Sequence, residues 1–281
     1  MKLELVSVAT DTYPLDGIFY QPEGGPARAG ALIMHGNQGN FYSGPPRFLP
    51  PALAELGIAT LAFNRRGHDI LGTHLGRAPV GGALQLTEEA IADNRYAAAF
   101  LADRGLPAPL LIGHSNGGLL AGQHAADHPQ TPGLVLLSAA GGGLGSTELT
   151  SRSGLLLGER YSELVREAER LVQAGLGGQL MVIPGWWWVI SAASLWDRLH
   201  HLPDLVEVAP RVTAPSFFLK GAAEPESVYP ARAFARACAG GCEVVELEDC
   251  DHWYRGRELE VSAQVAGWLK RLLAGPPRGG R

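Results

Sequence analysis

Cysteine is scarce in this chain, and the few present argue against a disulfide framework. The 281 residues include three cysteines, Cys238, Cys242 and Cys250. Their number is odd, and their spacing does not form a C-x-x-C pair. We therefore expect free, buried thiols, with a Cys238–Cys242 link as the alternative.

Long hydrophobic runs are absent as well. No window approaches the roughly 20 apolar residues that a membrane-spanning helix requires. The opening stretch, MKLELVSV, alternates polar and apolar residues as a strand does and lacks the apolar core of a secretion signal. These two absences predict a cytoplasmic protein with no membrane partner.

Positive charge is neither in excess nor clustered. The chain has 23 Lys and Arg against 28 Asp and Glu, for a formal net charge of −5. Without a basic patch, it lacks the electrostatic footprint of a nucleic-acid-binding protein. We expect no nucleic-acid partner. The hydrophobic content of 46% allows a sizeable core, and the length suits one large α/β domain with an insertion or two small domains.

Apolar runs alternate with helical patterns along most of the chain. This alternation predicts βαβ units and a mostly parallel sheet. Strands are expected near residues 2–10, 15–21, 29–34, 58–63, 110–113, 134–137, 217–219 and 244–247. Helices are expected at 87–104, 117–128, 229–239 and 257–273.

Residues 145–210 break this alternation. Within them, 159–173 has the apolar stripe of an amphipathic helix, and a Gly-rich stretch and two short helical pieces follow. The predicted organisation is an α/β core at 1–144 and 211–273. Residues 145–210 are expected to form an inserted helical cap that covers the functional site of this core. The Gly- and Pro-rich end, 274–281, is expected to be disordered.

The segment Gly113-His114-Ser115-Asn116-Gly117 has the form G-x-S-x-G. It follows a buried apolar run and precedes a helical pattern, which is the context in which this motif exposes a serine on a sharp turn. The flanking glycines remove Cβ atoms that would collide in so tight a bend. Ser115 is therefore the candidate nucleophile.

A serine nucleophile requires a base and a group that orients that base. His252 follows the last expected strand in the polar segment Asp249–Tyr254, and it is the candidate general base. The orienting acid should lie between nucleophile and base in the chain. Glu224, three residues after Gly221, is our first candidate, and Glu226 is the alternative.

Hydrolysis through a tetrahedral intermediate also requires two backbone N–H donors for the oxyanion. Asn116, which follows the nucleophile, supplies one. The second is expected from the loop His35-Gly36-Asn37-Gln38-Gly39-Asn40 after a buried strand, with Asn37 first and Gln38 next. The alternative for this loop is a Gly/Asn turn with no chemical role.

Taken in order, these motifs resemble those of the α/β-hydrolase superfamily over about residues 1–273. The matching segments are His35-Gly36, Asn64-Arg65-Arg66-Gly67-His68, Gly113–Gly117, Gly221-Ala222-Ala223-Glu224 and Asp251-His252. The resemblance implies a cofactor-free hydrolase with a Ser-acid-His triad. It also implies an α/β fold with a mostly parallel central sheet of about eight strands flanked by helices, and a helical cap inserted after the sixth.

The chain departs from the family pattern at two positions. Glu224 stands where members usually have Asp. Because its side chain is longer and needs a different backbone offset, Glu226 remains the alternative for the orienting acid. Asn64 stands where many members have Asp, at a position that is usually structural. The nucleophile is Ser and not Asp, which argues against the haloalkane dehalogenase and epoxide hydrolase branches.

Three adjacent tryptophans, Trp186, Trp187 and Trp188, lie in the predicted cap. At least one is expected to face the pocket, where it would contact an apolar acyl or aryl part of a small-molecule substrate. Alternatively, two pack within the cap and one lies at the surface or in a homodimer contact. Phe41 and Tyr42, just past the oxyanion loop, are expected to line the entrance.

No metal site is expected. His124 and His128 share a helix face, but they lack the glutamate of H-E-x-x-H, and we interpret them as solvated surface side chains. The predicted activity is hydrolysis of a carboxylic ester, lactone or thioester. The alternatives are C–C bond or amide hydrolysis or acyl transfer on the same triad, and a non-catalytic small-molecule receptor.

Overall fold

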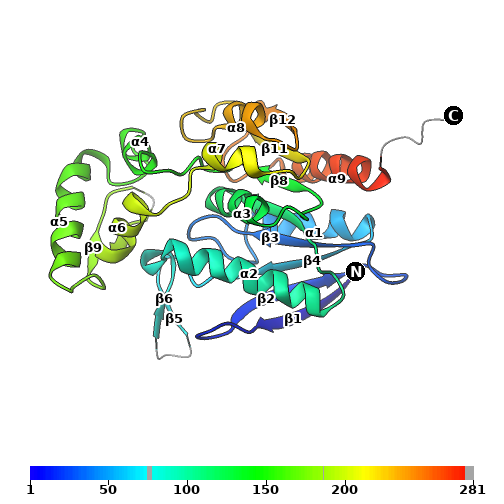
Figure 1. The fold of residues 1–281 in the computed structure, drawn as a ribbon, viewed down its shortest axis with the longest axis horizontal. Coiled ribbons are helices and arrows are strands. Elements are labelled where there is room, and N and C mark those ends of the chain that lie inside the picture. The colour runs from blue at the N-terminus through cyan, green and yellow to red at the C-terminus, as the bar shows by residue number, and fades with distance from the viewer. Residues whose placement is uncertain (75–77, 186, 276–281) are drawn as a thin grey trace.

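A twisted sheet of eight strands forms the centre of the molecule (Figure 1). The structure, a computed structural model, describes residues 1–74, 78–185 and 187–275. The order across the sheet is β1-β2-β4-β3-β7-β8-β11-β12; β1 and β2 are antiparallel to their neighbours, and the other strands are parallel. The strands are β1 (Lys2–Val8), β2 (Leu15–Gln21), β3 (Ala29–Met34), β4 (Ile58–Phe63), β7 (Leu110–His114), β8 (Leu134–Leu137), β11 (Ser216–Gly221) and β12 (Cys242–Leu247). The predicted sheet and its strands are confirmed to within a few residues.

Side chains of the central strands alternate between the two faces of the sheet, as the pleat requires. In β3, Leu32 and Met34 pack into the core on one face, and Ala31 and Ile33 pack into the core on the other. All four are fully buried. Because helices cover both faces, these strands are continuous apolar runs without a polar side.

Helices form a layer on each face of the sheet. On one face lie α2 (Thr87–Asp103), α3 (Asn116–Asp127), α7 (Leu205–Val208) and α8 (Ala231–Ala237); on the other lie α1 (Pro45–Glu55) and α9 (Glu258–Ala274). The four predicted core helices are confirmed. Helix α1 was not predicted, because its prolines, including Pro50 and Pro51 inside the helix, indicate a loop. It is stabilised by Leu49 and Leu53, which are buried against the sheet.

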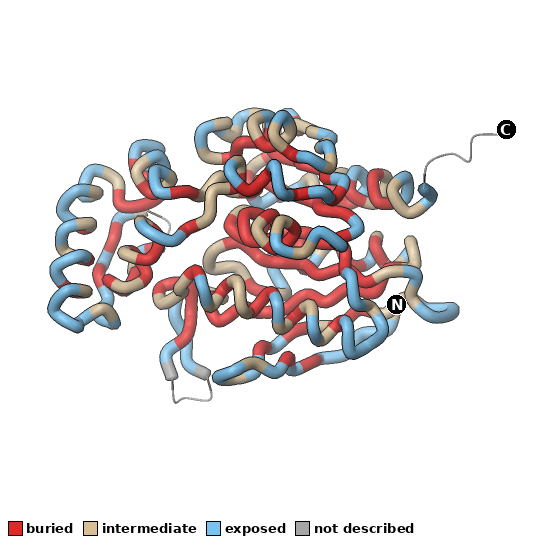
Figure 2. Tube along the Cα trace, viewed as in Figure 1, coloured by how far each residue is buried: buried red, intermediate tan, exposed pale blue. Residues whose placement is uncertain are grey.

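Between β8 and β11 the chain leaves the sheet and builds a second, smaller cluster. It comprises α4 (Ser146–Arg152), α5 (Tyr161–Gln173), the hairpin β9 (Leu180–Val182) and β10 (Val189–Ser191), and α6 (Ala192–His200). A separate apolar core joins α5, the hairpin and α6, with Leu164, Ala168 and Leu171 contributed by α5. The outer face of α5 is exposed (Figure 2). After α6 the chain returns to the main sheet, where Leu205 and Val208 of α7 pack into the core beside α3.

The remaining elements are short. Strands β5 (Gly72–His74) and β6 (Ala78–Val80) form a hairpin, and single turns of 3-10 helix lie at Gly82–Leu84, Gly158–Arg160 and Ala209–Arg211. Ala274, expected to begin the disordered tail 274–281, still belongs to α9. Residues 276–281 lie outside the described residues.

All three cysteines are free, as predicted. Cys238 and Cys250 are buried, and Cys242 is partly exposed. Among the described residues, no helix combines the length and the apolar character needed to span a bilayer.

Candidate active site

Ser115 lies on a strained turn between β7 and α3. Its backbone has φ 55° and ψ −122°, a conformation that costs a non-glycine residue free energy. The turn is held by a 2.9 Å hydrogen bond from the Ser115 N–H to the Leu137 carbonyl of β8. A Cβ at Gly113 would collide with the Gly117 carbonyl, and one at Gly117 would collide with the Met34 carbonyl. The glycines of the motif therefore allow the backbones to approach this closely.

His252 and Glu224 form a close pair at the carboxyl edge of the sheet. Glu224 follows β11 and His252 follows β12, so the neighbouring parallel strands bring them together. The distance from His252 Nδ1 to Glu224 Oε1 is 2.6 Å, and each side chain is only 9% exposed. Because carboxylate Oε1 is an acceptor, this contact favours the tautomer with the proton on Nδ1.

The second oxygen of Glu224 is fixed by groups that the sequence did not single out. Glu224 Oε2 accepts hydrogen bonds from Ser138 Oγ at 2.6 Å and from the Gly221 N–H at 2.8 Å. Ser138, at the end of β8, also contacts Tyr254 Oη at 2.7 Å, and Tyr254 donates to the Leu219 carbonyl. Buried Lys220 donates to the Glu224 carbonyl at 2.7 Å. These contacts leave the carboxylate one orientation, toward His252.

Glu226, the alternative acid, lies elsewhere. Its Oε1 accepts hydrogen bonds from the backbone N–H groups of Arg232 and Ala233, at 2.7 and 3.1 Å. These groups belong to the first turn of α8, where free N–H groups attract a carboxylate. Glu226 therefore caps a helix, and the contact with His252 belongs to Glu224.

His114, the variable residue before the serine, supports the loop of His252. Its Nε2 contacts the His252 carbonyl at 2.8 Å, and the two rings lie 4.8 Å apart. Burial lowers the pKa of His114 to about 3, so that its ring is neutral and donates the Nε2 proton to the carbonyl. This contact could not be predicted from the motif, which specifies no residue at this position.

The predicted oxyanion residues lie on both sides of the nucleophile. Asn116 begins α3, and Asn37 follows β3 in a loop whose Gly36 closely approaches Ser115 and His114. In the part of the chain that the structure describes, neither backbone N–H donates to another group. His35 fixes the loop: its Nε2 accepts from the Arg65 N–H at 3.1 Å, and Arg65 Nη2 donates to the His35 carbonyl at 2.5 Å.

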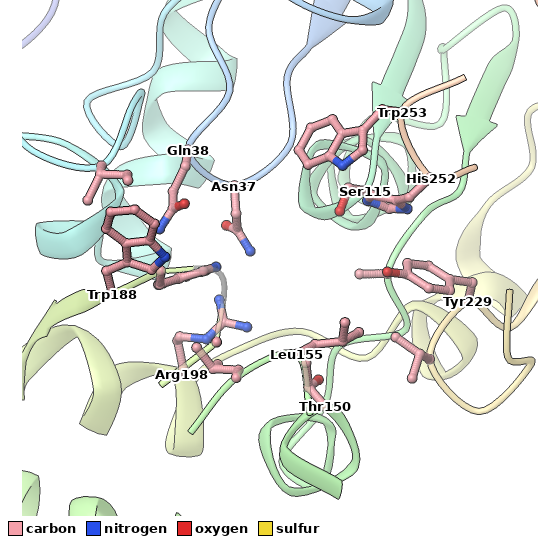
Figure 3. A pocket seen from close by; sticks show the side chains of 16 residues that line it. Asn37, Gln38, Ser115, Thr150, Leu155, Trp188, Arg198, Tyr229, His252 and Trp253 are labelled. Atoms are coloured by element: carbon pink, nitrogen blue, oxygen red, sulfur yellow. The ribbon is translucent and has the colours of Figure 1, made fainter. Parts of the chain in front are cut away.

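Ser115 and His252 face a cavity of about 440 Å³ between the sheet edge and the inserted cluster (Figure 3). Its described lining residues are Asn37, Gln38, Ile70, Ser115, Ala140, Thr150, Leu155, Leu156, Gly185, Trp187, Trp188, Arg198, Val228, Tyr229, His252 and Trp253. The core supplies the reactive groups, and the inserted cluster supplies the opposite wall. A cavity of this size suits a small organic molecule.

Both tryptophans of this segment that the structure describes, Trp187 and Trp188, line this cavity. Trp187 is buried in the core of the inserted cluster, whereas Trp188 is 70% exposed. Trp186 lies outside the described residues. The expectation for Phe41 and Tyr42 was wrong, because neither lines the cavity. A 2.9 Å hydrogen bond from the Phe41 N–H to Asn64 Oδ1 turns the chain toward α1, where Phe41 packs on the core, and Tyr42 is exposed.

Among the described residues, no group of three or more His, Cys, Asp or Glu side chains could hold a metal ion. The interpretation of His124 as a solvated side chain was wrong. Its ring is buried and stacks on His128 at 4.0 Å between centroids, whereas His128 is partly exposed. Burial, followed by the neighbouring His128, lowers the pKa of His124 to about 4.

The fold and the order of these residues agree with comparisons to known proteins. No curated protein sequence matches the chain. Among solved structures, Est1E from Butyrivibrio proteoclasticus with bound ferulic acid has a TM-score of 0.73 at 18% identity, covering 96% of this chain and 99% of its own. The α/β hydrolase GrgF from Penicillium sp. has a TM-score of 0.75 at 14% identity, covering 98% and 100%.

The esterase domain of a Rhodothermus marinus protein has a TM-score of 0.65 at 19% identity, over 96% of this chain and 99% of its own. At such identities these likenesses show the fold alone. The sequence profile described as "Alpha/beta hydrolase family" matches residues 31–264, which include Ser115, Glu224 and His252. The chain belongs to the α/β hydrolase family.

Proposed function

We propose that the protein is a serine hydrolase that cleaves a carboxylic ester, with lactones and thioesters as related substrates. The observation that carries the proposal is the 2.6 Å contact between His252 Nδ1 and Glu224 Oε1 at the cavity that also receives Ser115. A nucleophile, a base and an orienting acid are the parts that acyl transfer requires.

The geometry assigns a role to each group. Glu224 accepts a hydrogen bond from Nδ1 of His252, so that the unprotonated Nε2 takes the Ser115 proton as Oγ attacks the carbonyl carbon. His252 then protonates the leaving alcohol as the C–O bond breaks and an acyl-enzyme forms on Ser115. Water attacks this ester and loses a proton to His252. His252 returns that proton to Ser115 Oγ as the bond between Oγ and the acyl carbon breaks and the acid leaves.

The negative charge that develops on the carbonyl oxygen needs donors fixed in advance. The backbone N–H groups of Asn116 and Asn37 supply them, one from the start of α3 and one from the loop after β3. Both belong to rigid turns, so they do not have to reorganise as the charge forms.

The wall opposite Ser115 favours a substrate with an apolar acyl or aryl part. Trp187, Trp188, Leu155 and Leu156 supply flat aromatic and aliphatic surface there. Esterases among the structural neighbours, including Est1E with ferulic acid bound, are consistent with such a substrate class.

The test is turnover of p-nitrophenyl esters of graded chain length by the wild type and by Ser115→Ala. We expect Ser115→Ala to lose on the order of 10⁴-fold in kcat, because the triad members act as a unit. Its thermal unfolding should match that of the wild type, since the Ser115 side chain is not part of the packed core. Turnover by a folded Ser115→Ala variant within tenfold of wild type would refute the nucleophile. A wild type that neither turns over nor binds covalently to any ester would indicate a receptor.

A further inference from the structure

The wall of the cavity that faces Ser115 contains a buried cation without an acceptor. Arg198, on α6, is only 9% exposed. Its Nε and Nη1 are buried and have no hydrogen-bond partner among the residues that the structure describes. Burial lowers the pKa of Arg198 to about 10, so the guanidinium stays charged at neutral pH. A buried charge without a partner is unfavourable, and native proteins rarely retain one without a function.

None of the described residues that line the cavity neutralises the positive charge of Arg198. The described lining contains no carboxylate, and Glu224 lies behind the His252 ring. The charge of Asp197, next to Arg198 in sequence, acts against the lowering of the Arg198 pKa, but its oxygens make no hydrogen bond with the guanidinium. Its Oδ2 accepts from the N–H and Oγ1 of Thr87, at 2.8 and 2.6 Å, and its Oδ1 contacts His201.

A second unpartnered donor lines the same cavity, from the loop that follows β3. The amide nitrogen Nε2 of Gln38 is buried and has no partner within the described ranges, and Gln38 also lines the cavity. In Figure 3, Gln38 and Arg198 both lie on the side of the cavity away from Ser115 and His252. Each side chain therefore has N–H groups without an acceptor on the side of the cavity opposite the nucleophile.

The guanidinium is held in place by an aromatic ring. Its central carbon lies 4.6 Å from the ring centroid of Trp187, within the range of a cation–π contact. This contact orients the planar fork of Arg198 without using its N–H groups. Those N–H groups stay available, and a planar fork matches the two oxygens of a carboxylate.

We propose that the substrate carries a carboxylate, separated from its scissile carbonyl by the width of the cavity, and that Arg198 with Gln38 binds this carboxylate. The proposal rests on the proposed esterase function and narrows its substrate class to anionic half-esters and carboxylated aryl esters. The carboxylate fixes the distance and orientation of the ester relative to Ser115. An uncharged ester of equal length leaves the guanidinium desolvated and unpaired, so it reacts more slowly.

The test uses two matched substrate pairs that differ by a single charge. One pair is the p-nitrophenyl monoester of adipic acid and its terminal amide, which places the charge on the acyl side. The other is 4-acetoxybenzoate and 4-acetoxybenzamide, which places it on the leaving group. We expect the anion of at least one pair to exceed its amide in kcat/KM by about tenfold or more, as for a charged, bidentate contact. Equal values within both pairs would overturn the proposal.

Variants separate recognition from packing. In Arg198→Gln, the preference for the anion should fall to within about threefold, while turnover of the amide changes little. Arg198→Lys, which keeps the charge, should retain part of the preference. Arg236→Gln removes an exposed arginine of α8 and should leave the preference unchanged. If Arg198→Gln and Arg198→Lys slow the anion and the amide by the same factor, Arg198 is a packing residue and the proposal is wrong.

A binding experiment distinguishes this failure from a failure of the proposed function. Monomethyl adipate and its terminal amide are titrated by calorimetry into Ser115→Ala, which does not depend on turnover. The acid should bind about tenfold or more tightly than the amide, and adding Arg198→Gln should remove the difference. If the wild type hydrolyses no ester but this difference is present, the reaction is wrong and the anion site stands. If acid and amide bind equally, the anion site is wrong.

Discussion

At the scale of single residues, the site contains a series of contacts that fixes the position of the proton on His252 Nδ1. Ser138 and the Gly221 N–H hold one oxygen of Glu224, and the other oxygen contacts His252 Nδ1. His114 holds the backbone of His252 from the opposite side. Each contact restricts the rotation of the side chain that follows in the series. The imidazole of His252 is therefore oriented with Nε2 toward the cavity before substrate binds.

This series of contacts predicts different effects of substitution at Glu224 and Glu226. Glu224→Gln should lower kcat on the order of 10³–10⁴-fold, because an amide no longer stabilises the charged imidazole and can present its N–H to Nδ1. Glu226→Gln keeps an oxygen for the N–H groups of α8 and is the matched control, with activity within about threefold of wild type. Steady-state kinetics on one ester, with unfolding curves for both variants, decide the matter. If Glu226→Gln loses activity and Glu224→Gln keeps it, Glu226 and not Glu224 is the orienting acid.

The residues visible from the sequence were those that a motif marks by position. Ser115, His252 and Glu224 each follow the end of a strand, and parallel strands bring such positions to one edge of the sheet. No motif marks Ser138, His114 or Arg198 for its role, although Ser138 also follows a strand. Their roles depend on residues distant in the chain, such as Glu224, 86 positions after Ser138, and local patterns carry no information on such contacts.

At the scale of elements, helix α3 both begins at the nucleophile and carries a buried histidine. His124 lies on the side of α3 that packs against α2, and its Nδ1 has no partner among the described residues. The sequence placed the helix correctly but not the exposure of this side chain. Short apolar residues fill α3, so its periodicity does not show that nearly all of its faces are buried.

The buried ring predicts a loss of stability in acid. The pKa of His124 is about 4 in the folded protein and near 6.5 when the ring is exposed. Between these values the unfolded chain binds the proton and the folded protein does not, so the stabilisation is complete above about pH 6.5 and is lost as pH falls toward 4. From pH 7.5 to 5, His124 alone should lower the free energy of unfolding by about 2 kcal/mol.

Urea unfolding at pH 7.5 and at pH 5 measures this effect. His124→Leu should lose less stability than the wild type over this interval, by about 2 kcal/mol. His200→Leu, which changes an exposed histidine on α6, should keep the wild-type dependence. If wild type and His124→Leu lose the same free energy, the His124 ring does not titrate as its burial implies.

At the scale of the whole molecule, the cavity exists only because two parts of the chain meet. The sheet edge supplies Ser115 and His252, and the inserted cluster between β8 and β11 supplies Trp187, Trp188 and Arg198. The sequence predicted the sheet and the insertion because both depend on local periodicity. It did not predict which face of the inserted cluster covers the site, because that choice depends on packing between distant segments. Phe41 and Tyr42 were misplaced because the contact of Phe41 with Asn64, which turns their loop toward α1, joins residues far apart in the chain.

Trp188 tests the contribution of the inserted cluster without disturbing its core. The side chain lines the cavity but is largely exposed, so Trp188→Ala should leave the thermal stability nearly unchanged. It should raise KM for an aryl or long-chain ester by about fivefold, for about 1 kcal/mol of lost apolar contact. A short acetate ester should be affected much less.

Tyr42→Ala is the control for this experiment, since it removes an exposed aromatic ring that does not line the cavity. Neither ester should respond to it. If Trp188→Ala changes the acetate and the bulky ester by the same factor, the ring does not contact the substrate.

Trapping the covalent intermediate tests the central claim most directly. The protein is treated with a fluorophosphonate, which reacts with a serine activated by a neighbouring base, and its peptides are mapped by mass spectrometry. We predict a single adduct on Ser115, absent in Ser115→Ala and formed far more slowly in Glu224→Gln. An adduct on another residue, or equal labelling of wild type and Ser115→Ala, would contradict the account.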